Sequence, residues 1–81
     1  MFEYNICNMP DEEIFTRQCS ALEKHIPNIF KKELLEDVDG SKTQLYKIGI
    51  NNVSVHNSEY IGAVFIKSDI DLTPYFKYGK Y

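Results

Sequence analysis

The sequence predicts a small α+β domain, in which a sheet of about four strands carries one or two helices packed on one face. Three observations lead to this prediction: an alternating N-terminal segment, a helical stripe of apolar residues after it, and a return to alternation from Thr43 onwards. The chain of 81 residues is long enough for one domain, 1–81, with a single modest core. The expected sheet combines an N-terminal strand with an antiparallel meander of about three strands.

The first 26 residues predict one strand and one helix. The strand is indicated by apolar residues that alternate with polar ones, Phe2, Tyr4 and Ile6. Either Asn8 or Asp11 can cap the helix that follows, and Pro27 ends it near Ile26. Its apolar stripe consists of residues at spacings of four, three and four: Phe15, Cys19, Leu22 and Ile26.

The segment 28–39 fits either a helix or a strand, and the sequence leaves the choice open. As a helix, it ends at Gly40, which tolerates the left-handed C-terminal conformation. As a strand, it leads into a tight hairpin turn at Asp39 and Gly40. We expect a helix, because a regular strand would mix the charged residues Lys32 and Glu36 with the apolar ones on a single face.

The alternation after Thr43 predicts a meander with two turns. A turn at residues 51–52 would place Ile50 opposite Val53, and a second turn is expected at 57–58. These registers put one set of apolar side chains on the face that meets the helix: Ile48, Ile50, Val53, Val55, Val64 and Ile66.

The third strand of the meander, residues 60–67, is apolar on both faces. Such a strand is usually an inner strand, so we expect the N-terminal strand to pair beside it. The reverse face of the meander is also mostly apolar, with Leu45, His56, Ile61, Ala63 and Phe65. Either the fold covers this face or it is an exposed interface. A short helical turn is expected at Thr73 and Pro74.

The composition argues against several classes of protein. Twelve acidic and nine basic side chains give a net charge of −3, whereas a general nucleic-acid binder needs a basic excess. The N-terminus lacks the pattern of a secretion signal, and no apolar stretch approaches the ~20 residues of a membrane span. We therefore expect a cytoplasmic protein with Cys7 and Cys19 as free thiols.

The sequence predicts neither a metal or cofactor site nor a catalytic residue. The acidic stretch before Gly40 resembles a calcium loop, but Leu35 and Tyr46 occupy positions that require oxygen ligands. The soft ligands lack the short paired spacing of a zinc site: Cys7, Cys19, His25 and His56. No paired nucleophile and base and no glycine-rich phosphate loop stand out.

The expected function is to bind and modulate or inhibit another protein without catalysis. Small acidic α+β domains of this kind include immunity proteins, antitoxins and phage-encoded inhibitors. The acids would steer the chain towards a basic partner surface, and aromatic residues would then occlude that surface. The expected contact residues are two groups of acids and two residues of the reverse face: Glu33, Glu36, Asp37, Asp39, Asp69, Asp71, Phe65 and His56.

Two other functions stay open. The first is a small homodimeric enzyme or ligand-binding domain that uses the sheet face around His56, together with Tyr46 or Tyr60. The second is a binder of single-stranded nucleic acid, because aromatic residues and lysines interleave in the C-terminal run 75–81.

Overall fold

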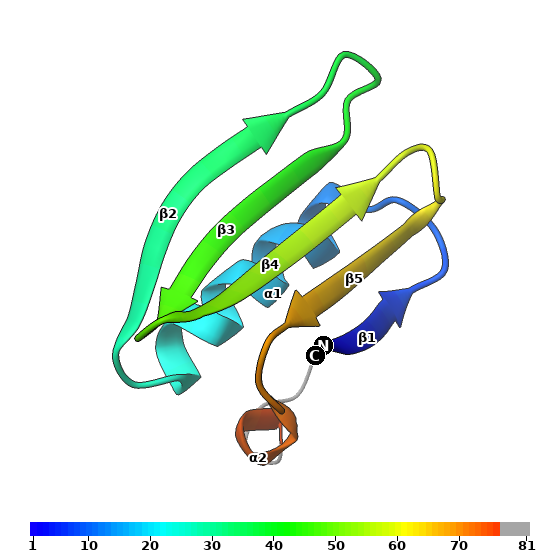
Figure 1. The fold of residues 1–81 in the computed structure, drawn as a ribbon. Coiled ribbons are helices and arrows are strands. Elements are labelled where there is room, and N and C mark those ends of the chain that lie inside the picture. The colour runs from blue at the N-terminus through cyan, green and yellow to red at the C-terminus, as the bar shows by residue number, and fades with distance from the viewer. Residues whose placement is uncertain (77–81) are drawn as a thin grey trace.

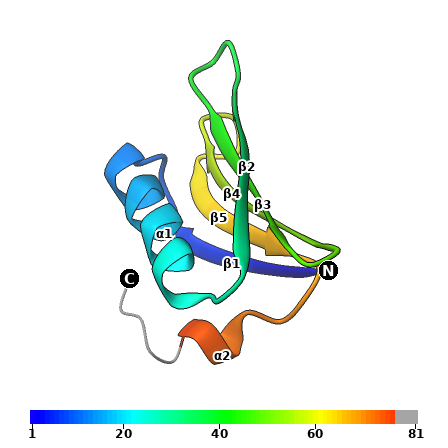
Figure 2. The ribbon, with the colours of Figure 1, turned by 90° about the vertical axis from the view of Figure 1, so that its left-hand side faces the viewer.

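Five strands form one antiparallel sheet in the computed structural model of the chain, which describes residues 1–76. The spatial order of the strands is β1-β5-β4-β3-β2, and the helix α1 crosses one face of the sheet (Figures 1 and 2). The fold is therefore α+β, with five strands where about four were expected. The elements in chain order are β1 (Phe2–Cys7), α1 (Glu12–His25), β2 (Ile29–Glu36), β3 (Lys42–Ile48), β4 (Asn51–Ser58), β5 (Ala63–Ser68) and α2 (Thr73–Phe76).

The helix α1 begins and ends where the sequence predicts. Asp11 caps it, with its Oδ1 atom accepting a hydrogen bond of 3.0 Å from the backbone N–H of Ile14. Ile26 is the C-cap residue, and Pro27 prevents a further helical turn. The predicted stripe is buried against the sheet: Phe15, Cys19, Leu22 and Ile26. Burial also raises the pKa of the Cys19 thiol, as expected of a packing residue.

The side chains of the meander that face α1 are largely those predicted, but both predicted turns were wrong. β4 continues through residues 57–58, where the second turn was expected, and that turn lies at residues 59–62, so β5 begins at Ala63 rather than at residue 60. The turn between β3 and β4 also differs. Val53 lies opposite Tyr46 rather than opposite Ile50. Gly49 and Ile50 form the turn, because Gly49 can adopt the positive φ of 62° that a two-residue hairpin requires. The register therefore differs from the prediction by an even number of residues, which keeps each side chain on its predicted face. Only Ile50 leaves the core, and it is exposed.

The segment 28–39 contains the edge strand β2, so the expected helix was wrong. A bulge between Lys31 and Leu34 breaks the alternation that the sequence argument assumed. The buried side chain of Gln44 satisfies the bulge, because its Nε2 atom donates to the backbone carbonyls of Lys32 (2.9 Å) and Glu33 (3.2 Å). An edge strand also needs no continuous apolar face, and most of β2 is exposed.

The strand β1 pairs antiparallel with β5, which confirms that β5 is an inner strand. The chain then turns beneath the sheet into α2, within which the expected helical turn at Thr73 lies. Leu72 is fully buried at this end of the core, and its backbone N–H donates to the Tyr4 hydroxyl at 2.8 Å. Residues from both ends of the described chain therefore close the same side of the core.

Tyr46 connects the sheet to the helix. Its side chain is 1% exposed, and its hydroxyl donates a 2.6 Å hydrogen bond to Oε2 of Glu23 on α1. Lys31 lies 3.5 Å from the same carboxylate oxygen. Burial and the bond to Glu23 raise the pKa of Tyr46, so the hydroxyl stays protonated and remains a donor.

We expect Tyr46→Phe to lower the free energy of unfolding by about 1–2 kcal/mol, because a buried hydrogen bond to a charged group is lost while the ring still fills the core. Urea denaturation followed by circular dichroism measures this change. Tyr60→Phe is the control, since Tyr60 is 91% exposed and should change little. Equal stability of the two variants would show that the Tyr46 hydroxyl contributes nothing.

Candidate functional site

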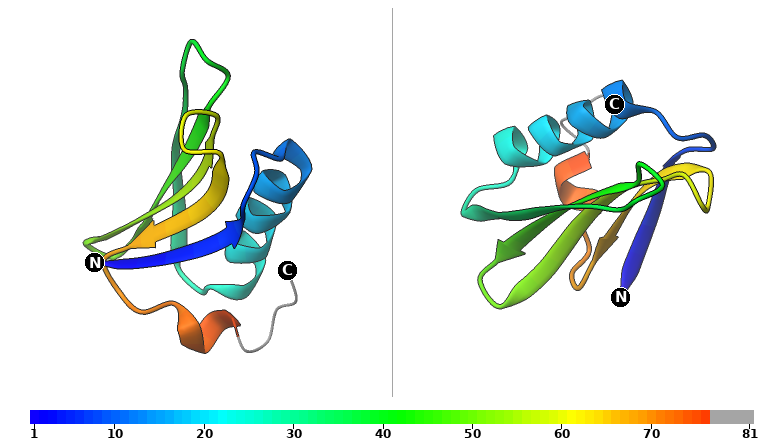
Figure 3. Two further views of the ribbon diagram at one scale, coloured as in Figure 1. Left: turned by 90° about the vertical axis from the view of Figure 1, so that its right-hand side faces the viewer. Right: turned by 90° about the horizontal axis from the view of Figure 1, so that it is seen from above.

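The sheet face opposite α1 is the candidate functional surface, and we name it the open face. No described element packs on it (Figures 2 and 3). The strand registers arrange its side chains in rows across the sheet. One row crosses all five strands and consists of Leu35, Thr43, His56, Phe65 and Asn5. The neighbouring rows contribute Leu45, Ser54, Lys67 and Glu3 on one side, and Phe30, Lys47 and Asn52 nearer β2.

His56 lies at the centre of the open face and is held from three directions. Its Nδ1 atom lies 3.2 Å from Oγ1 of Thr43, and its Nε2 atom lies 2.7 Å from Oγ of Ser54. Its ring stacks on Phe65, with 4.6 Å between the ring centroids and 7° between the planes. Phe65 is therefore only 7% exposed, although it lies on the open face. These contacts within the chain hold the side chains at the centre of the face in a fixed arrangement.

The environment of His56 favours the neutral ring. Burial lowers the pKa of His56, and the positive charge of Lys67 lowers it further. Glu3 acts in the opposite direction as a smaller effect. Both ring nitrogens have hydroxyl partners, so the ring and the two hydroxyl groups hold one another in position.

The open face is locally basic, although the whole chain is acidic. Lys67 places its Nζ atom 5.7 Å from the centre of the Phe65 ring, and Lys32 places its Nζ atom 5.5 Å from that of Phe30. Lys47 lies opposite Phe30 in the β2–β3 pairing. The rows themselves contain Lys47, Lys67 and one acid, Glu3, while Lys32 and Glu33 lie in the bulge of β2. The surface charge of this face is therefore opposite to the net charge of −3.

The acids predicted to contact a partner lie at two opposite ends of the sheet. One group is at the end of β2 and in the turn after it, and the other follows β5. Three of these carboxylates accept local hydrogen bonds: Asp37 from the Val38 N–H, Asp39 from Ser41, and Asp71 from Thr73. Asp69 accepts from Asn52 of β4, and Asp71 also accepts from Tyr4 of β1, so these two acids connect distant segments. Glu33 and Glu36 belong to the edge strand and are exposed.

The local hydrogen bonds also lower the pKa values of two acids. The backbone N–H of Ser41 lowers the pKa of Asp39, and the hydroxyl of Thr73 lowers that of Asp71. These local hydrogen bonds therefore give Asp39 and Asp71 a structural role that requires no binding partner. Their role in binding stays a prediction, and the predicted acids do not form one continuous surface.

The structure places His56 and Phe65 together on the open face, whereas the tyrosines expected beside His56 lie elsewhere. Tyr46 is buried beneath α1, and Tyr60 points into solvent from the β4–β5 turn. Phe30 and Leu35 were not predicted for this face, because only the bulge in β2 turns both side chains to it. The residues that contact the His56 ring nitrogens, Thr43 and Ser54, gave no sequence signal beyond alternation.

The described part of the chain offers no arrangement suited to a metal ion. Within residues 1–76, no three side chains of His, Cys, Asp or Glu come together as a metal site would require. Cys7 and Cys19 are both free thiols. His56 lines neither the hollow between β1 and α1 nor the shallower one beside Phe65. Over the same residues, no helix is long and apolar enough to cross a membrane.

The C-terminal run 75–81, considered above as a nucleic-acid contact, falls mostly outside the described residues, which end at 76. The comparisons with known proteins leave the open face to be interpreted from its own chemistry. No family model, curated protein or solved structure matches the chain.

Acidification below about pH 6.5 should destabilise the protein through His56, because the unfolded chain takes up a proton on this side chain at a higher pH than the folded chain does. The stabilising effect is complete above that pH and is lost as the pH falls through the lowered pKa of the folded state. Urea denaturation between pH 7 and pH 5 measures the slope.

His56→Gln should show a flatter slope over the same range, since an amide keeps hydrogen bonds to the two hydroxyls without titrating. His25→Gln, which leaves the open face intact, is the control and should retain the slope of the natural protein. An unchanged slope in His56→Gln would contradict this assignment.

Proposed function

We propose that the chain is a non-enzymatic binding protein that contacts and modulates another protein through the open face. The observation that supports this proposal most directly is that α1 covers only one face of the sheet, while the other carries large apolar side chains with no covering element among the described residues. Sheets with one solvated face usually place polar residues there.

Two apolar side chains on this face are accessible enough to contact a partner. Phe30 is 67% exposed and Leu35 is 48% exposed, and both lie on the edge strand. Burial of such side chains is worth about 1.5–3 kcal/mol each. Beside them, the stacked pair of His56 and Phe65 provides a rigid centre that loses little conformational entropy on binding.

The charge of the open face indicates the kind of partner. Lys32, Lys47 and Lys67 surround the apolar residues, so an acidic partner surface would be attracted to this face. The exposed acids at the ends of the sheet would instead favour a basic rim on the partner, as the sequence suggested. A protein that covers a functional surface of its partner in this way is a modulator or inhibitor, the class to which immunity proteins and antitoxins belong.

Single-stranded nucleic acid is the second candidate partner, and the same lysines favour it. Binders of single strands combine basic residues with aromatic rings on which bases stack. On the open face, only Phe30 offers an accessible ring among the described residues, because Phe65 is covered by His56. We therefore favour a protein partner, because exposed apolar side chains with lysines around them are sufficient to bind a protein surface.

The double variant Phe30→Ser/Leu35→Ser should lose at least about tenfold in partner capture, because it removes the accessible apolar contacts. Both side chains are largely exposed, so the fold should persist. Leu34→Ser is a close control: Leu34 is 47% exposed on the same strand but lies on the opposite face. The measurement is affinity capture from native lysate at low and high salt, with mass spectrometry.

Equal capture by the double variant and by Leu34→Ser would contradict binding through the open face. Charge reversal at Glu33 and Glu36 tests the acidic surface separately, since both lie outside the rows of the open face. Nuclease treatment of the lysate separates a protein partner from a nucleic acid. The mass of the purified chain in solution shows whether a second copy occupies the face.

A further inference from the structure

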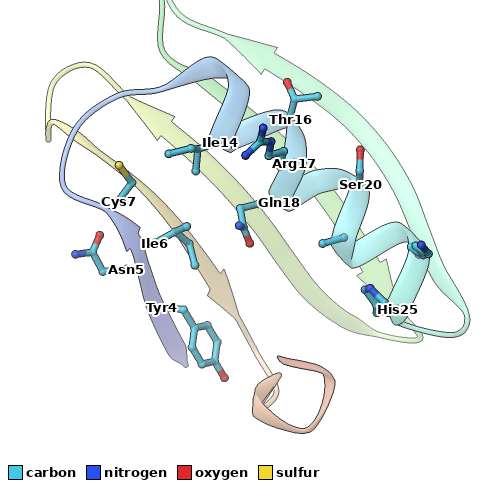
Figure 4. Close-up of a pocket in the computed structure, with 12 residues that line it drawn as sticks. Tyr4, Asn5, Ile6, Cys7, Ile14, Thr16, Arg17, Gln18, Ser20 and His25 are labelled. Atoms are coloured by element: carbon cyan, nitrogen blue, oxygen red, sulfur yellow. The ribbon is translucent and has the colours of Figure 1, made fainter. Parts of the chain in front are cut away.

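A groove separates α1 from the edge strand β1 (Figure 4). The helix makes its main contacts with β4 and β2, so the space beside β1 is left open. The hollow measures about 840 Å³, and it lies at the border of the helix-covered face, away from the His56 cluster. A volume of this size accommodates several side chains of a bound chain.

The groove reaches the unpaired edge of β1. Residues 4–7 of β1 all line it, and β1 is an edge strand of the sheet. β1 pairs only with β5, so its outer N–H and C=O groups have no strand partner among the described residues. The register shift lies between Asn5 and Cys7, which leaves residues 2–5 as a regular edge.

The helix turns a second stripe towards this groove. Its members lie at spacings of four, three and four and all line the hollow: Ile14, Gln18, Ala21 and His25. Gln18 is 2% exposed, and its buried Oε1 atom has no hydrogen-bond partner among residues 1–76. The Gln18 side chain points from α1 into the space beside Ile6 (Figure 4). An unsatisfied buried acceptor costs about 1–3 kcal/mol, and a donor from a bound chain would remove that cost.

The ionisable side chains of α1 that line the groove are all basic. Arg17, Lys24 and His25 line it, and no Asp or Glu of the described part of the chain does. Arg17 already has a partner, since its Nη2 atom lies 2.9 Å from Oε1 of Glu13. Lys24 and His25, at the end of α1, remain as the basic residues that face a ligand. In a chain of net charge −3, this arrangement favours an acidic ligand.

We propose that the groove binds an extended peptide segment of another protein, which adds to the outer edge of β1 as a further strand. The peptide's main chain pairs with β1, and a polar side chain on its helix-facing side donates to Oε1 of Gln18. An apolar side chain of the peptide packs on Ile6 and Ile14, and a carboxylate lies near Lys24. This site is separate from the open face, so each can bind without the other.

The test begins with a library of random seven-residue peptides displayed on phage and selected on the full chain. Selected peptides are synthesised with a fluorophore and titrated by fluorescence anisotropy. We expect sequences that alternate β-branched and polar residues and carry Asp or Glu. Amide shifts in the 15N-labelled protein should then concentrate in β1 and α1. Absence of any enriched peptide, or shifts confined to the open face, would overturn the proposal.

Gln18→Met gives the sharper test, because a similar volume without the polar atom separates binding from folding. Its thermal stability should equal or exceed that of the natural protein, while peptide affinity falls about tenfold. Lys24→Glu should weaken binding several-fold, whereas Lys47→Glu makes the same charge change on the open face and should not. The double variant Phe30→Ser/Leu35→Ser should bind the peptides normally.

Other occupants of the groove give different results. Equal peptide affinity in Gln18→Met, Lys24→Glu and the natural protein would refute the site. A mass in solution that falls from dimer to monomer in Lys24→Glu would assign the groove to a second copy instead. Groove shifts that change in Tyr78→Ala/Tyr81→Ala, with no peptide effect, would assign it to the chain's own C-terminus.

Discussion

The packing of one helical stripe on one face of one sheet organises the whole structure. The stripe of α1 meets valines and isoleucines from β4 and β5, and Tyr46 of β3 joins the two layers through Glu23. With one helix longer than a single turn among the described residues, the sheet has cover for one face only. The open face and the groove beside β1 both result from this shortage of cover.

The features predictable from sequence are those determined by local physics. Asp11, the apolar stripe and Pro27 define α1, because capping and periodicity act within a few residues. The face assignment of Val53 and Val55 survives an error in the turn, since strand side chains repeat every two residues. The strand β2 was not predictable in the same way. Its bulge depends on Gln44, which donates across the strand pairing from β3.

The candidate site shows a similar division. Alternation identified His56 and Phe65 as residues of the reverse face, and the structure stacks them. The net charge and the acidic runs pointed to the ends of the sheet, where several acids accept hydrogen bonds from within the chain. The net charge sums all charged residues regardless of their position, so it could not indicate that three lysines lie on one face. The groove beside β1 results from the position of α1 on the sheet, and no sequence pattern predicted it.

The bulge in β2 has a consequence for how the molecule behaves at high concentration. A long, flat, exposed edge strand is a template on which identical chains can stack into fibrils. β2 is the most exposed strand, but its bulge bends the edge, and charged Lys31, Lys32 and Glu33 occupy its middle. The amide of Gln44, by holding that bulge in place, thus protects the chain from self-templated aggregation at the edge where it is most exposed.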